Sequence, residues 1–413
     1  MNKTIKNFLN KIPKTDIHVH LDGSLRLSTL IELAKQAKVE LPSYEETGLR
    51  ETVFKDKYND LPDYLRGFSY TCAVMQNAEN LERIAYELAQ DNLLENVRYL
   101  EVRYAPHLHI NRNLPSIDKI VQAVYKGLEK ARVEHDNTEA VKNGKDIPFK
   151  YGIILGAMRY FNENMSPYFA GLLSSMPYAP STEVYKIASL ELARAAVELR
   201  DDLNLPIVGF DLCGPEKGFP AIDHHDAYRY AHKNFMEKTV HAGEAYGPES
   251  IFQAITDCHA NRIGHGTFLY HHDTIKDSDI KNPEKFSYYL AEYIAKRRIT
   301  IEVCPTSNLQ TIPKLRSILD HPVKDMIKNR LSVSVCTDNR LVSNTNVVKE
   351  LSLIVNNVHI TKKQLQDLVI AGFKGCFYHG SYSEHRAFVR TALNQYKLLE
   401  KEILGDISDS DIL

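Results

Sequence analysis

The stretch Thr15–Leu21 reads Thr-Asp-Ile-His-Val-His-Leu, a short apolar and β-branched run that predicts a strand. Side chains two residues apart on a strand point to the same face, so His18 and His20 are expected to lie side by side. If that face lies inside a closed barrel, an unpaired pair of imidazoles is unfavourable there, and a metal ion would satisfy both. An alternative of about equal weight is an accidental pair whose rings bind backbone carbonyls.

Seven further runs of this kind follow along the chain, and most of the segments between them show helical periodicity. In Leu81–Glu95, for example, Leu81, Ile84 and Leu88 fall on one face. The seven runs are Val97–Tyr104, Tyr151–Leu155, Pro206–Leu212, Lys238–His241, Arg262–Gly264, Ile299–Val303 and Leu331–Cys336. The other segments with a helical pattern are Ile120–Val133, Ala188–Leu199, Pro248–Ile255, Val347–Val358 and Thr361–Phe373. Eight alternating units predict an α/β fold, a (β/α)8 TIM barrel with additional helices after the first strand and at the C-terminus.

No repeat, low-complexity tract or long linker divides the chain, so residues 1–413 are predicted to form a single barrel domain. Residues 27–95 are expected to supply a helical lid region over the site. The polar segment 135–146 is predicted to be a surface loop, and the acidic tail 405–413 to be flexible.

The charge balance excludes several classes of partner. The chain has 51 Lys and Arg residues against 53 Asp and Glu residues, which leaves no basic stripe for nucleic acid and no polybasic anchor for a membrane. Its first residues lack the apolar stretch of a signal peptide, and no segment approaches the ~20 apolar residues of a membrane span. Six widely spaced Cys residues suggest reduced thiols, so we expect a cytoplasmic protein.

Four further chemical patches end predicted strands. They are His241-Ala-Gly-Glu244, Gly264-His265-Gly266, Cys304-Pro-Thr-Ser-Asn308 and Thr337-Asp338-Asn339. Active sites of TIM barrels lie at the carboxyl ends of the strands, so these patches should meet the paired histidines. His18, His20, His241 and Asp338 together would give Zn²⁺ four protein ligands with room for a water, as in a mononuclear zinc hydrolase. Any one of them alone would more often be an ordinary core or loop residue.

Two residues in these patches suit proton transfer. Glu244 lies three residues after His241, beyond a glycine that allows a sharp turn, and we expect it to carry protons beside the metal. Without that context it would be an exposed loop residue. His265, between two glycines, is expected to orient or polarise the attacking water; a fifth metal ligand and a histidine held by packing are the alternatives.

Two neighbouring features bear on substrate and metal count. Asp22, just after the histidine pair, could accept hydrogen bonds from substrate hydroxyls, or could equally cap the following helix. The fourth predicted strand ends Gly-Phe-Asp-Leu-Cys-Gly over residues 209–214, without the lysine that binuclear relatives of this architecture modify to bridge two metals. One zinc per subunit is therefore favoured.

The assembled pattern resembles the adenosine deaminase family of the amidohydrolase superfamily, from about Thr15 to about Glu384. The stretches that carry the resemblance are TDIHVHLDGSLR, LPDYLRGFSY, VRYLEVRYAPHL, FDLCGPE, TVHAGEAYGPESI, RIGHG, EVCPTSN and TDN. Any one of these motifs is a weak signal, but their order and spacing together are specific. The resemblance implies a (β/α)8 barrel that binds one Zn²⁺ through His18, His20, His241 and Asp338.

The resemblance also implies roles around a purine nucleoside. Glu244 would protonate purine N1 and His265 would activate a zinc-bound water, whose hydroxide attacks C6 and releases ammonia. The Gly214 backbone N–H would meet N3, and Asp22 the ribose 5′-hydroxyl. Three residues match hydrophobic positions around the nucleoside, although ordinary packing is as good an interpretation: Tyr64, Phe68 and Met158. Ser307 could support the site from behind the ligands.

One position departs from the family pattern. Many members have a second Asp where this chain has Asn339, and that Asp pairs with purine N7; an amide can donate the same hydrogen bond without first binding a proton. The leading hypothesis is hydrolysis of adenosine and 2′-deoxyadenosine to inosine and ammonia in purine salvage. Another 6-aminopurine, such as adenine or a modified adenosine, is the alternative substrate. A zinc-stabilised barrel that binds nucleoside without turnover is the alternative of a different class. The expected partner is a small molecule; a monomer is plausible, and the sequence leaves the oligomeric state open.

Overall fold

Eight parallel strands form one sheet in the order β1 to β8, each paired with the next along the chain. The strands are β1 Lys14–His20, β2 Val97–Tyr104, β3 Lys150–Met158, β4 Ile207–Cys213, β5 Glu237–Ala242, β6 Arg262–His265, β7 Thr300–Val303 and β8 Val333–Val335. A parallel bridge between Val19 and Asp338 joins the last strand to the first. There the Asp338 N–H donates to the His18 carbonyl (2.8 Å) and the His20 N–H donates to the Asp338 carbonyl (2.7 Å). The predicted (β/α)8 barrel is confirmed.

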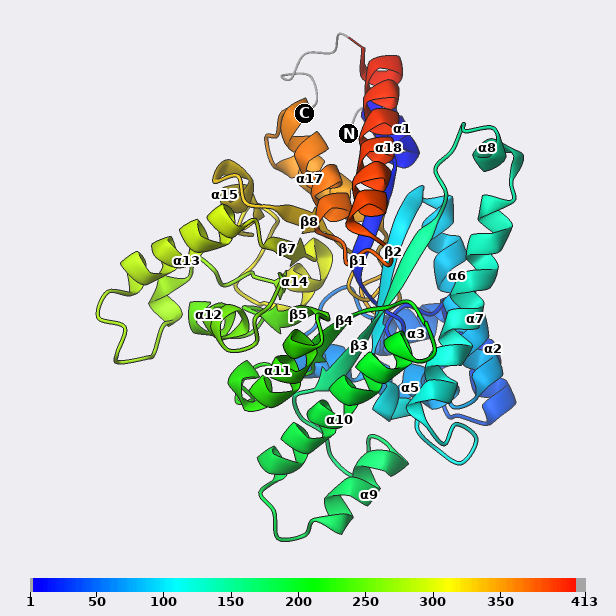
Figure 1. Cartoon of the computed structure of the whole chain (residues 1–413), viewed down its shortest axis with the longest axis vertical. Coiled ribbons are helices and arrows are strands. Elements are labelled where there is room, and N and C mark those ends of the chain that lie inside the picture. Colours follow the sequence, from blue (N-terminus) through cyan, green and yellow to red (C-terminus); the bar gives the residue numbers. More distant parts are fainter. Residues whose placement is uncertain (1–2, 406–413) are drawn as a thin grey trace.

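The computed structural model describes residues 3–405, so the predicted flexible tail lies outside the described residues except for Gly405. Helices precede, separate and follow the strands (Figure 1). The α-helices are α1 Lys3–Lys11, α2 Leu27–Ala37, α3 Glu46–Thr52, α4 Leu61–Leu65, α5 Gly67–Val74, α6 Ala78–Leu94, α7 Ile117–Asp136, α8 Glu139–Lys142, α9 Pro167–Ser175, α10 Ser181–Asp201, α11 His225–Lys233, α12 Pro248–Thr256, α13 Pro283–Arg297, α14 Pro305–Thr311, α15 Val323–Lys328, α16 Val347–Asn357, α17 Lys362–Gly375 and α18 Tyr382–Leu399. Short 3₁₀ turns are η1 Pro106–His109, η2 Ala221–His224 and η3 His272–Thr274, and η4 Glu400–Leu404 is a π turn.

Burial on both faces explains why the strands read as apolar runs rather than as alternating patterns. Every residue of β1 and β2 is buried, because side chains on one face fill the barrel and those on the other pack under the helices. The helices begin at recognisable signals. Asn77 caps α6 by accepting a hydrogen bond from the Asn80 N–H, and Thr361 and Gln364 form a capping box at α17.

The hydrophobic core has one large cluster and two small ones, the smallest of which consists of Ile154, Val208 and Phe377. The large cluster runs from Ile5 on α1 to Leu404 in η4 and includes the barrel interior. A second cluster lies between α9 and the start of α10, and its buried members are Phe161, Phe169, Val184, Tyr185 and Ala188. Helix α9 lies at the end of the molecule opposite α1 and α18 (Figure 1). The α9 segment therefore has a small core of its own beside the mouth of the barrel.

Several boundaries differ from the sequence-based expectations. Segment 135–146 is not simply a loop, because α7 continues to Asp136 and α8 occupies Glu139–Lys142. Helix α8 has no buried residue, so it carries no apolar periodicity that a sequence pattern could reveal. Strand β8 is three residues long, shorter than the predicted 331–336, and neither α1 nor α9 was anticipated. Residues 27–95 do contain the extra helices α2 to α6. Within residues 3–405, no helix combines the length and the apolar character that crossing a membrane requires.

Candidate metal centre and active site

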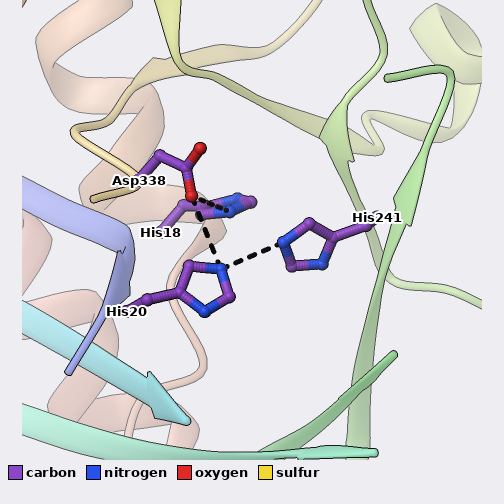
Figure 2. Close-up of side chains that lie close together, drawn as sticks. All are labelled: His18, His20, His241 and Asp338. Carbon is purple, nitrogen blue, oxygen red and sulfur yellow. Dashed lines mark hydrogen bonds and ion pairs between the residues drawn. The ribbon is translucent and has the colours of Figure 1, made fainter. Parts of the chain in front are cut away.

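The four predicted metal ligands converge at the carboxyl ends of the strands (Figure 2). His18 and His20 come from β1, His241 from β5, and Asp338 from the segment after β8. One ligand atom from each residue lies within 4.8 Å of the other three. The Nε2 atoms of His20 and His241 are 3.1 Å apart, and Asp338 Oδ1 lies 3.6 Å from His18 Nε2 and 3.5 Å from His20 Nε2. All four residues are buried.

Two buried carboxylates orient two of the imidazoles. His18 donates from Nδ1 to Glu302 Oε2 (2.7 Å), and His241 donates from Nδ1 to Asp211 (3.1 Å to Oδ2). Because a neutral imidazole carries one proton, each of these bonds leaves the Nε2 lone pair facing the centre of the cluster. Hydrogen bonds of this kind fix the ring orientation and raise the basicity of histidine ligands in metal sites.

A layer of buried arginines holds those carboxylates. Arg103 donates to Asp211 Oδ2 (2.9 Å) and to Glu302 Oε2 (2.8 Å), while Arg262 donates to Glu302 Oε1 (2.6 Å). Burial opposes the ionisation of Glu302, but the charges of Arg103 and Arg262 hold its pKa well below the usual value. The carboxylates therefore stay ionised behind the histidines.

The donor set fits a divalent metal ion. Burial lowers the pKa of His20 well below its usual value, so the ring is neutral and its lone pair is available. His18 Nε2 is buried without a hydrogen-bond partner, and two ring nitrogens face each other at 3.1 Å. A cation between these atoms would satisfy all of them, and three imidazoles with one carboxylate are typical ligands of zinc.

Glu244 lies beside this cluster on a loop that a second glutamate holds in place. Gly243, with φ +69°, makes the turn after β5 that the sequence predicted, and a Cβ there would come 2.6 Å from Ile251 Cδ1. The Glu216 carboxylate accepts hydrogen bonds from the backbone N–H groups of residues 243–246, at 2.6–2.9 Å, and from the Ser250 hydroxyl. Burial raises the pKa of Glu244 to about 8, which favours its protonated form at neutral pH.

His265 ends β6 and faces Glu244. Its Nε2 atom lies 3.7 Å from Glu244 Oε1, and its ring centroid lies 4.9 Å from that of His18. Its φ is 65° and that of Asp338 is 60°, in the left-handed region that His and Asp enter more often than most other residues.

A cavity of about 740 Å³ opens above the cluster, within the usual range for small-molecule sites. It is lined by His20, His241, Glu244 and Asp338, and by all six predicted substrate residues, namely Asp22, Tyr64, Phe68, Met158, Gly214 and Asn339. The lid residues that line it come from α4 and α5, while 162–167, just before and at the start of α9, form another part of the wall. The cavity thus brings the metal cluster, Glu244 and a largely apolar wall together.

The positions of Asp22 and Ser307 bear on the roles that were predicted for them. Asp22 does not cap α2, whose N-cap is Arg26; its Oδ1 is buried without a hydrogen-bond partner, and burial raises its pKa to about 7. Ser307, on α14, donates from its hydroxyl to Asp338 Oδ2 (2.6 Å). Asp22 therefore offers a free acceptor to the cavity, and Ser307 supports a predicted ligand from behind.

Asn339 lies against both Asp338 and Gly23. It donates from Nδ2 to Asp338 Oδ1 (2.8 Å), and its own Oδ1 is buried without a partner. A Cβ on Gly23 would come 1.9 Å from that oxygen, so only glycine fits there. The amide has a second N–H that this bond leaves free, which is the donor the sequence analysis assigned to purine N7.

Sequence reasoning missed most of the residues that support the site. Asp211, Glu302 and Arg103 lie in stretches that carried the family resemblance, but they received no role. The signal was a charged side chain inside a strand predicted to be buried, which is costly unless it is paired. Glu216, which holds the Glu244 loop, also lies in such a stretch but follows its strand, and the wall at 162–167 gave no comparable signal.

Comparisons with known proteins show which family the chain belongs to. A family model described as adenosine deaminase matches residues 13–143 and 182–387. An adenosine deaminase of Mycobacterium ulcerans is 35% identical over 374 residues, covering 89% of this chain and 91% of that protein. The match to the family model leaves out 144–181, which includes α9 and the cavity wall at 162–167.

Solved structures share the fold. An amidohydrolase from Burkholderia ambifaria with bound zinc is 19% identical, with a TM-score of 0.74, and the match covers 98% of this chain and 96% of that one. The Arabidopsis protein ADAL in complex with GMP is 25% identical, with a TM-score of 0.71 and coverage of 94% and 98%. By the family match and the sequence identity, the chain belongs to the adenosine deaminase family, whose members are hydrolases acting on C–N bonds.

Proposed function

We propose that this protein is a zinc-dependent aminohydrolase that converts adenosine and 2′-deoxyadenosine to inosine or 2′-deoxyinosine and ammonia, as in purine salvage. The observation that carries the proposal is the cluster of three buried imidazoles and Asp338, with Glu244 and His265 beside it. Of these residues, His20, His241, Glu244 and Asp338 line one cavity. A bound zinc ion would supply Lewis acidity, which lowers the pKa of water from 15.7 to about 7.

The residues of the chain supply the proton transfers. Glu244, protonated at neutral pH, gives its proton to purine N1, which makes C6 more electrophilic. The resulting carboxylate takes a proton from the attacking water as the oxygen–C6 bond forms. That proton then goes to the departing amino group as the C6–N6 bond breaks. The hydroxyl on C6 gives its remaining proton to the Glu244 carboxylate as the C6=O bond forms, which restores protonated Glu244. Positioned acid–base groups of this kind contribute roughly 10²–10⁴-fold each.

The cavity wall favours a nucleoside over a nucleotide. Its lining includes four carboxyl groups, those of Asp22, Glu163, Glu244 and Asp338, and no Lys or Arg among the described residues. A 5′-phosphate carries about two negative charges and is usually bound by Arg or Lys side chains. The unpartnered Asp22 Oδ1 would instead accept a hydrogen bond from the 5′-hydroxyl. ADAL from Arabidopsis was solved in complex with GMP, so a nucleotide is the ligand with which a nucleoside has to be compared.

Other 6-aminopurines remain as the second candidate. Free adenine would use the same proton transfers at C6 but would leave Asp22 and the wall at 162–167 without a partner, because it has no ribose. The ribose contact therefore separates the candidates. Asp22→Ala would reduce the turnover of adenosine strongly and leave that of adenine nearly unchanged.

The test is a direct deamination assay with four substrates: adenosine, 2′-deoxyadenosine, adenine and adenosine 5′-monophosphate. The fall in ultraviolet absorbance and the released ammonia are measured before chelation, after exhaustive chelation, and after one equivalent of Zn²⁺ is restored. We expect turnover of both nucleosides, its loss on chelation and its recovery with zinc. Turnover that survives complete metal removal contradicts the mechanism, and nucleoside binding without any product identifies a binding protein.

A further inference from the structure

His265 belongs to a chain of hydrogen bonds that leads away from the cavity. Asn308 Nδ2 lies 3.1 Å from His265 Nδ1, and Asn308 Oδ1 lies 3.1 Å from His321 Nε2. His321 Nδ1 in turn accepts a hydrogen bond from the backbone N–H of Val323 (3.0 Å). His321 and Asn308 are buried, and both lie outside the cavity lining.

The backbone N–H of Val323 fixes the direction of this chain. A peptide N–H can only donate, so His321 Nδ1 must accept, and the single proton of the neutral ring must sit on Nε2. Burial lowers the pKa of His321 to about 3, so the ring is neutral at physiological pH. His321 Nε2–H therefore donates to the Asn308 side chain, whose acceptor is Oδ1.

The orientation of the Asn308 amide follows. If the amide were turned over, its Nδ2 would donate to His321 Nε2 while Val323 donates to Nδ1. The ring would then have to accept at both nitrogens, which a neutral imidazole cannot do. With Oδ1 toward His321, the amide directs Nδ2–H to His265 Nδ1, which must accept.

We infer that Val323, His321 and Asn308 hold His265 in the tautomer that carries its proton on Nε2, so that His265 serves the reaction as a hydrogen-bond donor and leaves the base role to Glu244. Nε2 is buried, has no hydrogen-bond partner, and lies 3.7 Å from Glu244 Oε1. Its N–H is therefore free to hold the attacking oxygen in place. His321 and Asn308 are positioning residues, because they act through His265.

This inference rests on the proposed function only where it concerns turnover, since the tautomer can be measured directly. The zinc-loaded protein labelled with ¹⁵N at histidine would be studied by long-range ¹H–¹⁵N correlation spectroscopy, which distinguishes the two neutral tautomers. We expect Nε2–H for His265 and for His321, with the signals assigned from His265→Gln and His321→Gln. A His265 ring protonated on Nδ1 overturns the inference, whether or not the protein deaminates adenosine.

Two substitutions test the chain through its consequences. In Asn308→Asp the carboxylate can only accept, so His265 should switch to Nδ1–H and present a lone pair at Nε2. Fixing a catalytic histidine in the wrong tautomer lowers kcat by as much as about 10⁴-fold in serine proteases, so we expect a fall of roughly 10²–10⁴-fold with KM changed less than about threefold. A switched tautomer with kcat unchanged would show that the Nε2 proton has no part in the reaction.

A matched pair at His321 separates positioning from packing. His321→Gln keeps one acceptor and one donor at a similar spacing, so Gln can accept from Val323 and donate to Asn308. His321→Phe fills the space with a ring but removes both groups. We expect the Gln variant to keep the Nε2–H tautomer of His265 and at least about a third of kcat. The Phe variant should give mixed tautomers and a kcat at least about tenfold lower. Equal losses in the two variants would mean that His321 acts by packing alone, and if the Phe variant does not fold, Asn308→Asp still decides the question.

Discussion

Replacing Glu302 by glutamine tests whether the buried carboxylate behind His18 tunes the metal site. The carboxylate accepts four hydrogen bonds: Oε2 from His18 and Arg103, and Oε1 from Arg262 and Thr239 (2.9 Å). A glutamine side chain has one oxygen, so its NH₂ group must face two of these donors in either orientation. The substitution therefore removes a charge and also creates a donor–donor clash.

Two magnitudes follow. Loss of a hydrogen bond that orients a histidine ligand typically weakens metal binding 10–100-fold, or about 1.4–2.7 kcal/mol. Breaking a buried ion pair by neutralising one partner costs about 3–5 kcal/mol of stability, because the guanidinium charges stay buried. Glu302→Gln should therefore weaken both metal affinity and the fold.

Glu101→Gln provides the matched control. Glu101 is also buried and also pairs with Arg262, but it contacts no predicted metal ligand. Zinc affinity would be measured by competition with a chromophoric chelator, and the free energy of unfolding by urea titration of the metal-free proteins. We expect both variants to lose stability and only Glu302→Gln to lose zinc affinity. Equal zinc affinities for Glu302→Gln and the unaltered protein, within a factor of two, would refute the reasoning.

Three further predictions rest on single groups. Glu216→Gln should lower kcat about 10–100-fold, because the loop that carries Glu244 loses the carboxylate that holds it. One equivalent of zinc should stay bound. Steady-state kinetics measure kcat and metal analysis measures the zinc content, and an unchanged kcat would contradict the anchoring role of Glu216. Asp22→Ala should lower kcat/KM for adenosine at least about tenfold and leave any kcat/KM for adenine within about threefold, and equal losses for the two substrates would contradict the ribose contact. Burial raises the pKa of Glu350 from 4.5 to about 7, so the folded state keeps a proton that the unfolded chain releases. This contribution to stability is present below pH 4.5 and is lost as pH rises toward 7, by about 3 kcal/mol. The stability of Glu350→Gln relative to the unaltered protein should therefore rise by about that amount between pH 4.5 and pH 8 in urea titrations, and a flat difference would show that the carboxyl titrates normally.

The barrel could be predicted because its strands and most of its helices carry strong local patterns. Runs such as 97–104 match β2 residue for residue, and the helix expected at 347–358 matches α16 to within one residue. Elements without an apolar face could not be predicted, as α8 shows. Strand β8 has only three residues, because the geometry of pairing with its neighbour, rather than amino-acid composition, sets where a strand ends. Glu244 and His265 could be named as candidates because their spacing from strand ends is a property of the sequence.

The supporting groups could not be found in the same way. Glu302 acts on His18 across 284 positions of sequence, and His321 acts on His265 through Asn308, so their roles exist only once the chain has folded. The wall at 162–167 belongs to a segment outside the match to the family model, where a resemblance to relatives offers no guide. A sequence motif identifies the candidate reactive side chains, while contacts with residues far away in the sequence set the protonation state and the orientation of those side chains.

The small separate core around α9 has a consequence for how this protein can change. Phe161 and Phe169 stack on each other with ring centroids 4.0 Å apart, so the segment is secured largely by its own side chains. The carboxylates behind His18 and His241 are held by Arg103 and Arg262, which belong to the barrel and not to this segment. A change confined to the side chains of 162–167 would therefore reshape the cavity wall without removing any of the hydrogen bonds that orient these two histidines.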